Sequence, residues 1–79
     1  MHKSEYQSAL DILAENIKAK RSVLGISQEE LALRSSVDRT FVSKIERAIA
    51  NPSLKTIYDI AVVLDISLSE LFQKVEREK

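Results

Sequence analysis

The apolar residues of this chain recur at intervals of three and four, the spacing that places side chains on one face of an α-helix. The spacing is clearest near the start, where one face carries Leu10, Leu13, Ala14 and Ile17. Five stretches of the chain show this pattern, and we expect a helix in each: residues 6–24, 28–35, 39–47, 54–64 and 68–78.

Capping residues support these boundaries. Ser27 and Ser67 are each followed by Glu three positions later, which is the spacing of a capping box. Ser53 and Asp38 precede two further helices and have side chains that suit an N-cap. Gly25 is the stop signal after the first helix.

Composition narrows the fold class and the chemistry. The chain has 79 residues with one Gly, one Pro and no Cys, so residues 1–79 are expected to form a single all-α domain. His2 is the only histidine, so disulfides, thiolate metal sites and histidine-based acid–base catalysis lack their residues. We therefore expect no enzyme, no cofactor and no metal. The longest apolar run, residues 60–64, is too short for a membrane span, and without a secretory pattern we expect a cytoplasmic protein.

Charge is balanced over the whole chain but not along it. Twelve basic and twelve acidic residues cancel, which argues mildly against a nucleic-acid partner. Residues 34–55, however, hold five basic and two acidic side chains, whereas residues 56–79 hold three basic and five acidic ones. The basic middle is the candidate for contact with an anionic partner, since only a docking face experiences the phosphates.

The second and third predicted helices are joined by very few residues, so they must cross at a steep angle, as in a helix-turn-helix. Ala32 provides a small residue for the crossing, and apolar side chains for the interior are available at Leu31, Val37, Val42 and Ile45.

The third predicted helix has two contrasting sides. At roughly 100° per residue, Phe41, Val42 and Ile45 fall on one side. The other side has no acid and carries Arg39, Thr40, Ser43, Lys44 and Arg47. Cations and short hydroxyls suit the base edges and phosphates of a DNA major groove, although a charged helix face is more often only a solvated surface.

Residues 17–72 resemble the lambda-repressor-like (Cro/C1, XRE-type) helix-turn-helix family, whose fold is a five-helix DNA-binding domain. The resemblance rests on Lys-Arg at 20–21, Leu-Gly-Ile-Ser-Gln-Glu-Glu-Leu-Ala at 24–32, Val-Ser-Lys-Ile-Glu-Arg at 42–47, Asn-Pro-Ser-Leu at 51–54 and Ile-Ser-Leu-Ser-Glu-Leu-Phe at 66–72. Within the family, Asp-Arg-Thr-Phe-Val-Ser at 38–43 is most similar to the controller proteins of restriction–modification systems.

The resemblance implies roles for individual residues. Arg39 is the preferred base reader, Phe41 lies at the groove edge, and Gln28 and Asn51 hold phosphates. The full set of implied DNA contacts is Gln28, Arg39, Thr40, Phe41, Ser43, Lys44, Arg47 and Asn51.

Arg21 and Glu46 are implied to form an internal ion pair between the first and third helices, with a position of Arg21 near the DNA backbone as the alternative. Two positions where the family often has Gly are Ser36 and Ala48. Ser36 would then be strained by roughly 1 kcal/mol in a left-handed turn, and the third helix is expected to run slightly longer through Ala48.

Useful DNA specificity requires two half-sites, so a dimer surface is expected. We predict a two-fold interface from the end of the fourth helix and the fifth helix, with residues 66–79 contributing the dimerisation helix. Its predicted residues are Val62, Val63, Leu68, Leu71, Phe72 and Val75. The alternative is that the fifth-helix residues belong to the core of one chain, with Leu68 and Leu71 the first candidates.

These features favour a homodimeric transcription regulator that binds an inverted repeat in double-stranded DNA. It would regulate its own gene, control a restriction–modification system and bind no small molecule; RNA polymerase is a further candidate partner. The alternatives are an antitoxin or phage-type repressor with the same fold, or a protein-interaction module that has lost DNA binding.

Overall fold

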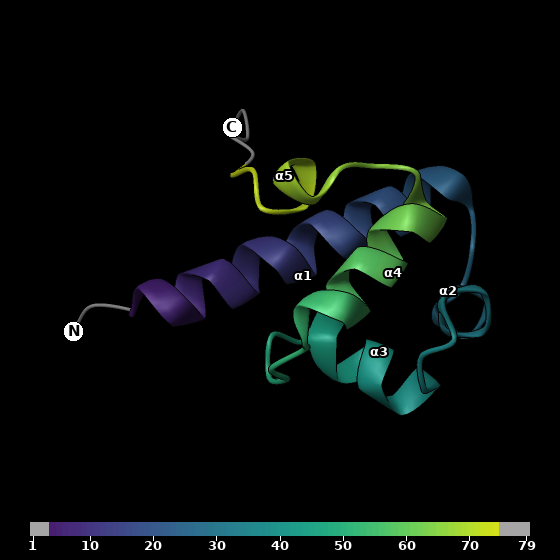
Figure 1. Cartoon of the computed structure of the whole chain (residues 1–79), viewed down its shortest axis with the longest axis horizontal. Coiled ribbons are helices and arrows are strands. Elements are labelled where there is room, and N and C mark those ends of the chain that lie inside the picture. The colour runs from purple at the N-terminus through teal and green to yellow at the C-terminus, as the bar shows by residue number, and fades with distance from the viewer. Residues whose placement is uncertain (1–3, 75–79) are drawn as a thin grey trace.

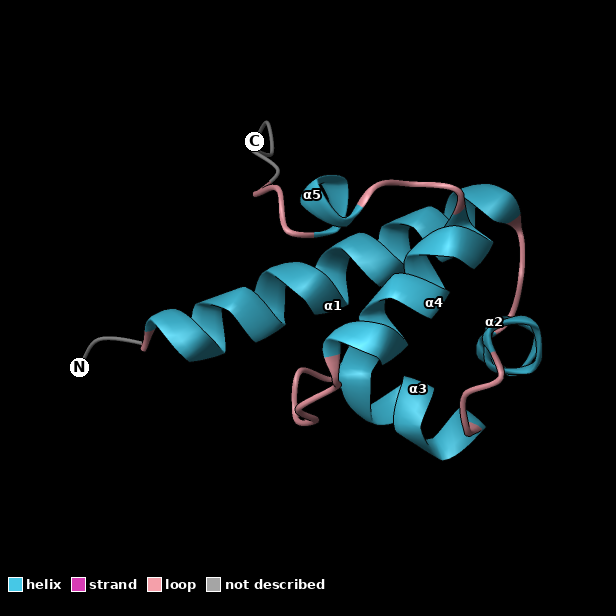
Figure 2. Ribbon diagram, in the orientation of Figure 1, coloured by secondary structure: helices cyan, strands magenta, loops and turns pink. Residues whose placement is uncertain are grey.

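A computed structural model describes residues 4–74, and this part of the chain is all-helical, as the sequence predicts (Figures 1 and 2). The helices are α1 (Glu5–Leu24), α2 (Gln28–Ser35), α3 (Arg39–Glu46), α4 (Leu54–Leu64) and α5 (Leu68–Leu71). The predicted bounds of α2 and α4 are confirmed, and α1 begins one residue early.

Serine side chains begin four of these helices. Ser4, Ser27, Ser53 and Ser67 each accept a hydrogen bond from the backbone N–H three residues on, at 3.0–3.1 Å. Only at Ser67 is the capping box complete. Asp38 occupies the N-cap position of α3, but its side chain makes no capping hydrogen bond, so the expected cap is absent there.

Left-handed residues end α2 and α3. Ser36 has φ 59°, as expected for the helix-turn-helix turn, and Ala48 has φ 60°. The prediction of a longer third helix is wrong, because α3 ends at Glu46. The N–H of Ile49 donates to the carbonyl of Lys44 at 3.1 Å, which is the six-to-one bond of a Schellman ending. Ala48 therefore takes the conformation that glycine would take, and the helix stops.

The fifth helix is also shorter than predicted. It ends at Leu71, residues 72–74 are not helical, and residues 75–78 lie outside the described residues. Leu71 is 0% exposed and belongs to the core of the chain. Its prediction as a dimer contact is wrong, because a side chain already enclosed by its own chain cannot reach a partner.

The helices surround one apolar core. In Figure 1, α1 runs along the molecule and its N-terminal half extends beyond the other helices, while α4 packs against its C-terminal half. α5 contacts α1 and α4, and α2 and α3 pack against each other, α2 also against α4 and α3 also against α1. Each helix contributes to the core, which includes Leu13, Ile17, Leu31, Val42, Ile45, Ile60, Leu64 and Leu71. No helix within residues 4–74 has the length and apolar character needed to cross a membrane.

Candidate nucleic-acid interface

The outer side of α3 is open to solvent. Val42 and Ile45 are 0% and 2% exposed and fix the inner side of the helix in the core. On the opposite side Arg39, Thr40, Lys44 and Arg47 are exposed and Ser43 is half-buried. The cationic and hydroxyl-bearing side therefore faces outward, as the sequence predicts.

Phe41 lies at the margin of this surface. Its side chain is half-buried and packs against the core, which leaves part of the ring at the surface beside the outer side of α3. The structure shows that Phe41 packs against the core. Its predicted position at the edge of a DNA groove is compatible with this packing and stays a prediction.

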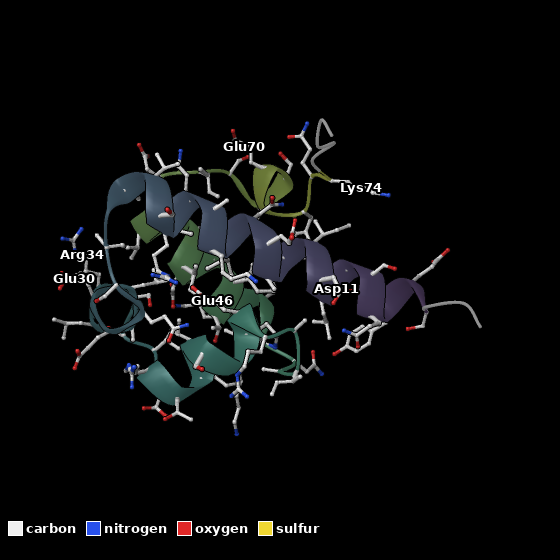
Figure 3. All side chains as sticks on the ribbon, turned by 180° about the vertical axis from the view of Figure 1, so that it is seen from behind. Asp11, Glu30, Arg34, Glu46, Glu70 and Lys74 are labelled. Atoms are coloured by element: carbon white, nitrogen blue, oxygen red, sulfur yellow. The ribbon has the colours of Figure 1, made fainter. Side chains whose placement is uncertain are left out.

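The carboxylate of Glu46 holds the first and third helices together. Glu46 is 4% exposed, and its two oxygens accept from Nε and Nη2 of Arg21 at 2.8 and 2.9 Å. Figure 3 shows Glu46 between α1 and α3. Arg21 also donates through Nη1 to the carbonyl of Ile26 at 3.0 Å. This two-pronged bond raises the pKa of the Arg21 guanidinium above its ordinary value. The implied ion pair is present, and it fixes the orientation of α3.

Gln28 has a role that the sequence analysis did not assign. Its Nε2 donates to Glu46 Oε1 at 2.9 Å, so its side chain turns inward and links the start of α2 to the same carboxylate. The predicted contact of Gln28 with a phosphate stays a prediction. Gln28 could still donate to a phosphate through its second amide hydrogen and through its backbone N–H at the helix N-terminus. Sequence spacing could not predict the hydrogen bond between Gln28 and Glu46, because the two residues lie on different helices.

The loop after α3 carries the last predicted DNA contact. Asn51 is exposed, and the neighbouring Pro52 is buried, which anchors the loop. Gln7 on α1 donates through Nε2 to the carbonyl of Ala48 at 3.2 Å. The extended N-terminal half of α1 therefore contacts the turn that leads from α3 to Asn51.

Acidic groups near the start of the interface are few. The first turn of α3 contains no acidic residue. On α2, Glu30 pairs with Nε of Arg34 at 2.6 Å, and Figure 3 shows the two side chains together on that helix. Among the described residues no group of His, Cys, Asp and Glu could hold a metal ion. The chemistry of the surface is that of cationic hydrogen-bond donors and hydroxyls.

The predicted dimer residues separate into exposed and packed positions. Val62 and Phe72 are 58% and 40% exposed. Val63 and Leu68 are partly buried and pack against the core, and Val75 lies outside the described residues.

Two exposed residues of α4 were missed as dimer candidates. Leu54 and Tyr58 are 68% and 52% exposed, and with Val62 they form a stripe at intervals of four. The four-residue spacing could have identified the stripe, but it does not reveal which of two apolar sides packs inward.

Comparison with known proteins agrees with this geometry. A Helix-turn-helix family model matches residues 17–71. Control protein C.SmaI of Serratia marcescens is 36% identical over 64 residues, which cover 81% of this chain and 76% of that protein.

Two solved structures are similar over most of the chain. The restriction-modification controller protein C.AhdI from Aeromonas hydrophila has a TM-score of 0.78 and 38% identity, covering 82% of this chain and 98% of that one. The controller protein C.Esp1396I, as a tetramer with its natural 35 base-pair operator, has a TM-score of 0.71 and 30% identity over 90% of this chain and all of that one. These relatives are regulators and not enzymes, and the chain belongs to the Helix-turn-helix family of DNA-binding transcription regulators.

Proposed function

We propose that the chain acts as a homodimer on an inverted-repeat operator in double-stranded DNA, with α3 of each copy in the major groove. The observation that carries the proposal is the outer side of α3, where exposed cations and hydroxyls face solvent while Val42 and Ile45 fix the helix from within. The Arg21–Glu46 pair holds this side in place, so little order has to be gained when DNA binds.

Each part of this surface has its own task. Arg39, in the first turn of α3, reaches a guanine, because its planar guanidinium can form two hydrogen bonds to one base edge. The short side chains of Thr40 and Ser43 let the helix approach the bases. Lys44 and Arg47 continue the cationic side along the groove. Phosphate and sugar contacts belong to Gln28, Phe41 and Asn51.

The dimer surface is the exposed apolar part of α4 and the segment after α5. Tyr58, Val62 and Phe72 are each at least 40% exposed, so their apolar surfaces are available to a partner. In a two-fold dimer both copies use the same surface, so the exposed apolar residues of each copy are covered by those of the other.

As a regulator without a ligand, the protein would respond to its own concentration and control its own gene. The controller proteins C.SmaI, C.AhdI and C.Esp1396I support a role in a restriction–modification system. Action on operator DNA implies a cytoplasmic protein. An operator next to a promoter would bring it beside RNA polymerase, whose recruitment or exclusion depends on the position of that operator.

Selection of bound duplexes from random DNA tests the proposal. We expect enrichment of an inverted repeat with half-site centres about one helical turn apart. Enrichment of a single unpaired half-site would contradict the dimer, and absence of enrichment would contradict sequence-specific binding.

The net charge of zero favours a second candidate, a protein-interaction module that has lost DNA binding. The two differ in salt dependence, because binding through several phosphates weakens steeply as salt rises. Absence of any salt-dependent binding to duplex DNA would favour the interaction module. The identity of the adjacent genes distinguishes the remaining candidates: nuclease and methyltransferase genes indicate a restriction–modification controller, a toxin gene indicates an antitoxin, and phage genes indicate a phage-type repressor.

A further inference from the structure

The C-terminal end of α5 is held by one side chain of α1. Nδ2 of Asn16 donates to the backbone carbonyls of Glu70, Leu71 and Gln73 at 3.3, 2.7 and 2.9 Å. All three partners are acceptors, so only the NH2 group of the amide can face them. Two N–H groups thus serve three carbonyls that lie 54 to 57 residues away in the sequence.

This contact is needed because α5 is only four residues long. A single turn of helix is not stable alone, and the last carbonyls of a helix have no partner within it. At the other end the reciprocal bonds of Ser67 and Glu70 satisfy the first N–H groups. Asn16 supplies the corresponding bonds at the C-terminal end. Figure 3 shows Glu70 on α5, which lies beside α1 in this view.

The carbonyls bound by Asn16 lie on both sides of Phe72 in the sequence. Leu71 is 0% exposed and fixes one neighbour of Phe72 in the core, while Phe72 itself is 40% exposed. With the carbonyls of Leu71 and Gln73 both bound to Asn16, the backbone at Phe72 has little freedom to turn. The Cα–Cβ bond of Phe72 therefore points in one direction before any partner arrives, and only the rotamer of the exposed ring is left to be selected.

We propose that Asn16 is a positioning residue of the dimer surface. It touches no DNA and needs no contact with the second copy; it fixes the direction in which Phe72 faces that copy. The inference rests on the proposed dimer. Because association costs less when the contacting groups are already ordered, loss of the amide weakens dimerisation while leaving the helix-turn-helix intact.

The test compares the variants Asn16→Ala and Asn16→Asp with the wild-type chain. The dimer dissociation constant is measured by sedimentation equilibrium, and backbone amide spectra report the state of each helix. For Asn16→Ala we expect a dissociation constant raised about tenfold, because the segment around Phe72 must then be ordered in each copy when the dimer forms. Asn16→Asp should weaken the dimer further, since it places a carboxylate against three carbonyl oxygens. Ser22→Ala, an exposed change on the same helix, should leave the dimer unchanged.

The spectra separate positioning from general support of the fold. Amide shifts should change at residues 70–73 and remain those of the wild type in α2 and α3. An unchanged dissociation constant would overturn the inference, and so would shifts that spread into α2 and α3. A wild-type chain that stays monomeric at every concentration would refute the proposed dimer itself, which is distinct from the failure of the Asn16 variants.

Discussion

At the residue scale, the carboxylate of Glu46 connects α3 to both α1 and α2. It accepts from Arg21 and from Gln28, and its own side chain is 2% exposed whereas that of Arg21 is 21% exposed. Glu46→Gln should lower the free energy of unfolding by about 3 kcal/mol, the lower end of the range for breaking a buried pair, because Arg21 keeps access to water. Urea unfolding measures this loss.

A matched control for that change is Glu30→Gln. Glu30 also pairs with an arginine, Arg34, but on an exposed helix surface. Its loss should cost at most about 0.5 kcal/mol, as for other pairs of this spacing. Equal effects of the two variants would show that the buried carboxylate adds nothing beyond a surface pair.

Arg39 carries the prediction on specificity. It is exposed on the outer side of α3, and a two-pronged bond to guanine distinguishes bases whereas a phosphate contact does not. Arg39→Ala should reduce the preference for the selected operator over random DNA by about 1–3 kcal/mol. Competition binding at fixed salt provides the measurement. Arg34→Ala, on α2 and paired with Glu30, should keep the preference. A loss that is equal on operator and random DNA would make Arg39 a phosphate contact.

At the element scale, the end of α3 depends on a left-handed alanine. Ala48 has φ 60°, a conformation that costs a residue with Cβ roughly 1 kcal/mol and glycine almost nothing. Ala48→Gly should therefore raise the free energy of unfolding by up to about 1 kcal/mol.

The same substitution within a helix should have the opposite sign. Ala19 is exposed in the interior of α1, and Ala19→Gly should lower the free energy of unfolding by about 1 kcal/mol. Thermal and urea unfolding of both variants test the pair. Destabilisation by Ala48→Gly would contradict the argument that strain is present at this turn.

The beginning of α5 gives a pH dependence. The backbone N–H of Ser67 donates to the carboxylate of Glu70 at 2.9 Å, and this bond lowers the pKa of Glu70 below its ordinary value of 4.5. Because the pKa is lower in the folded chain than in the unfolded one, the stabilisation is complete above the unfolded value and is lost as the pH falls through the folded pKa.

Glu70→Gln should accordingly be less stable than the wild type at neutral pH; the difference should shrink as the pH falls below the ordinary pKa of a glutamate and vanish below the lower pKa of Glu70 in the folded chain. Urea unfolding at neutral and acidic pH tests this, with Glu29→Gln in the first turn of α2 as the control for loss of a surface carboxylate. A difference that persists unchanged in acid would contradict the role of the ionised group.

Local signals explain why most of the elements could be predicted. Ser27 and Ser53 are followed at once by apolar periodicity, so the starts of α2 and α4 are encoded within a few residues. The end of α5 is not encoded in this way. The sequence continues in a helical pattern through Phe72 and Val75, but the carbonyls of Glu70 and Leu71 bond to Asn16, a contact between distant parts of the chain that no local pattern contains.

At the scale of the whole molecule, the same limit applies to the candidate site. The outer side of α3 was predictable because helical geometry alone separates Arg39 and Lys44 from Val42. The inward turn of Gln28 depends on Glu46, 18 residues away. Leu71 was predicted at the dimer surface, with the core as the alternative, and it is buried, because periodicity identifies an apolar side of a helix but not the neighbour that covers it.

The proposed dimer belongs to the scale of the whole molecule, and Val62 offers a direct test of it. Removing the fifth helix would take Leu71 out of the core, so a surface change is the better probe. Val62 is 58% exposed, and Val62→Glu should leave the fold of one chain nearly unchanged. In a two-fold dimer it places two carboxylates at an apolar contact, where their desolvation opposes association.

Sedimentation should then show monomers of Val62→Glu at concentrations where the wild type is a dimer, and operator occupancy should rise less steeply with protein concentration, since two copies would no longer bind as one unit. Tyr6→Glu is the control, because Tyr6 is 55% exposed near the start of α1, in the half of that helix that extends beyond the other helices (Figure 1). If Tyr6→Glu dissociated the dimer and Val62→Glu did not, the second copy would bind at the N-terminal half of α1. The steepness of the operator response would then depend on α1 rather than on α4 and the segment held by Asn16.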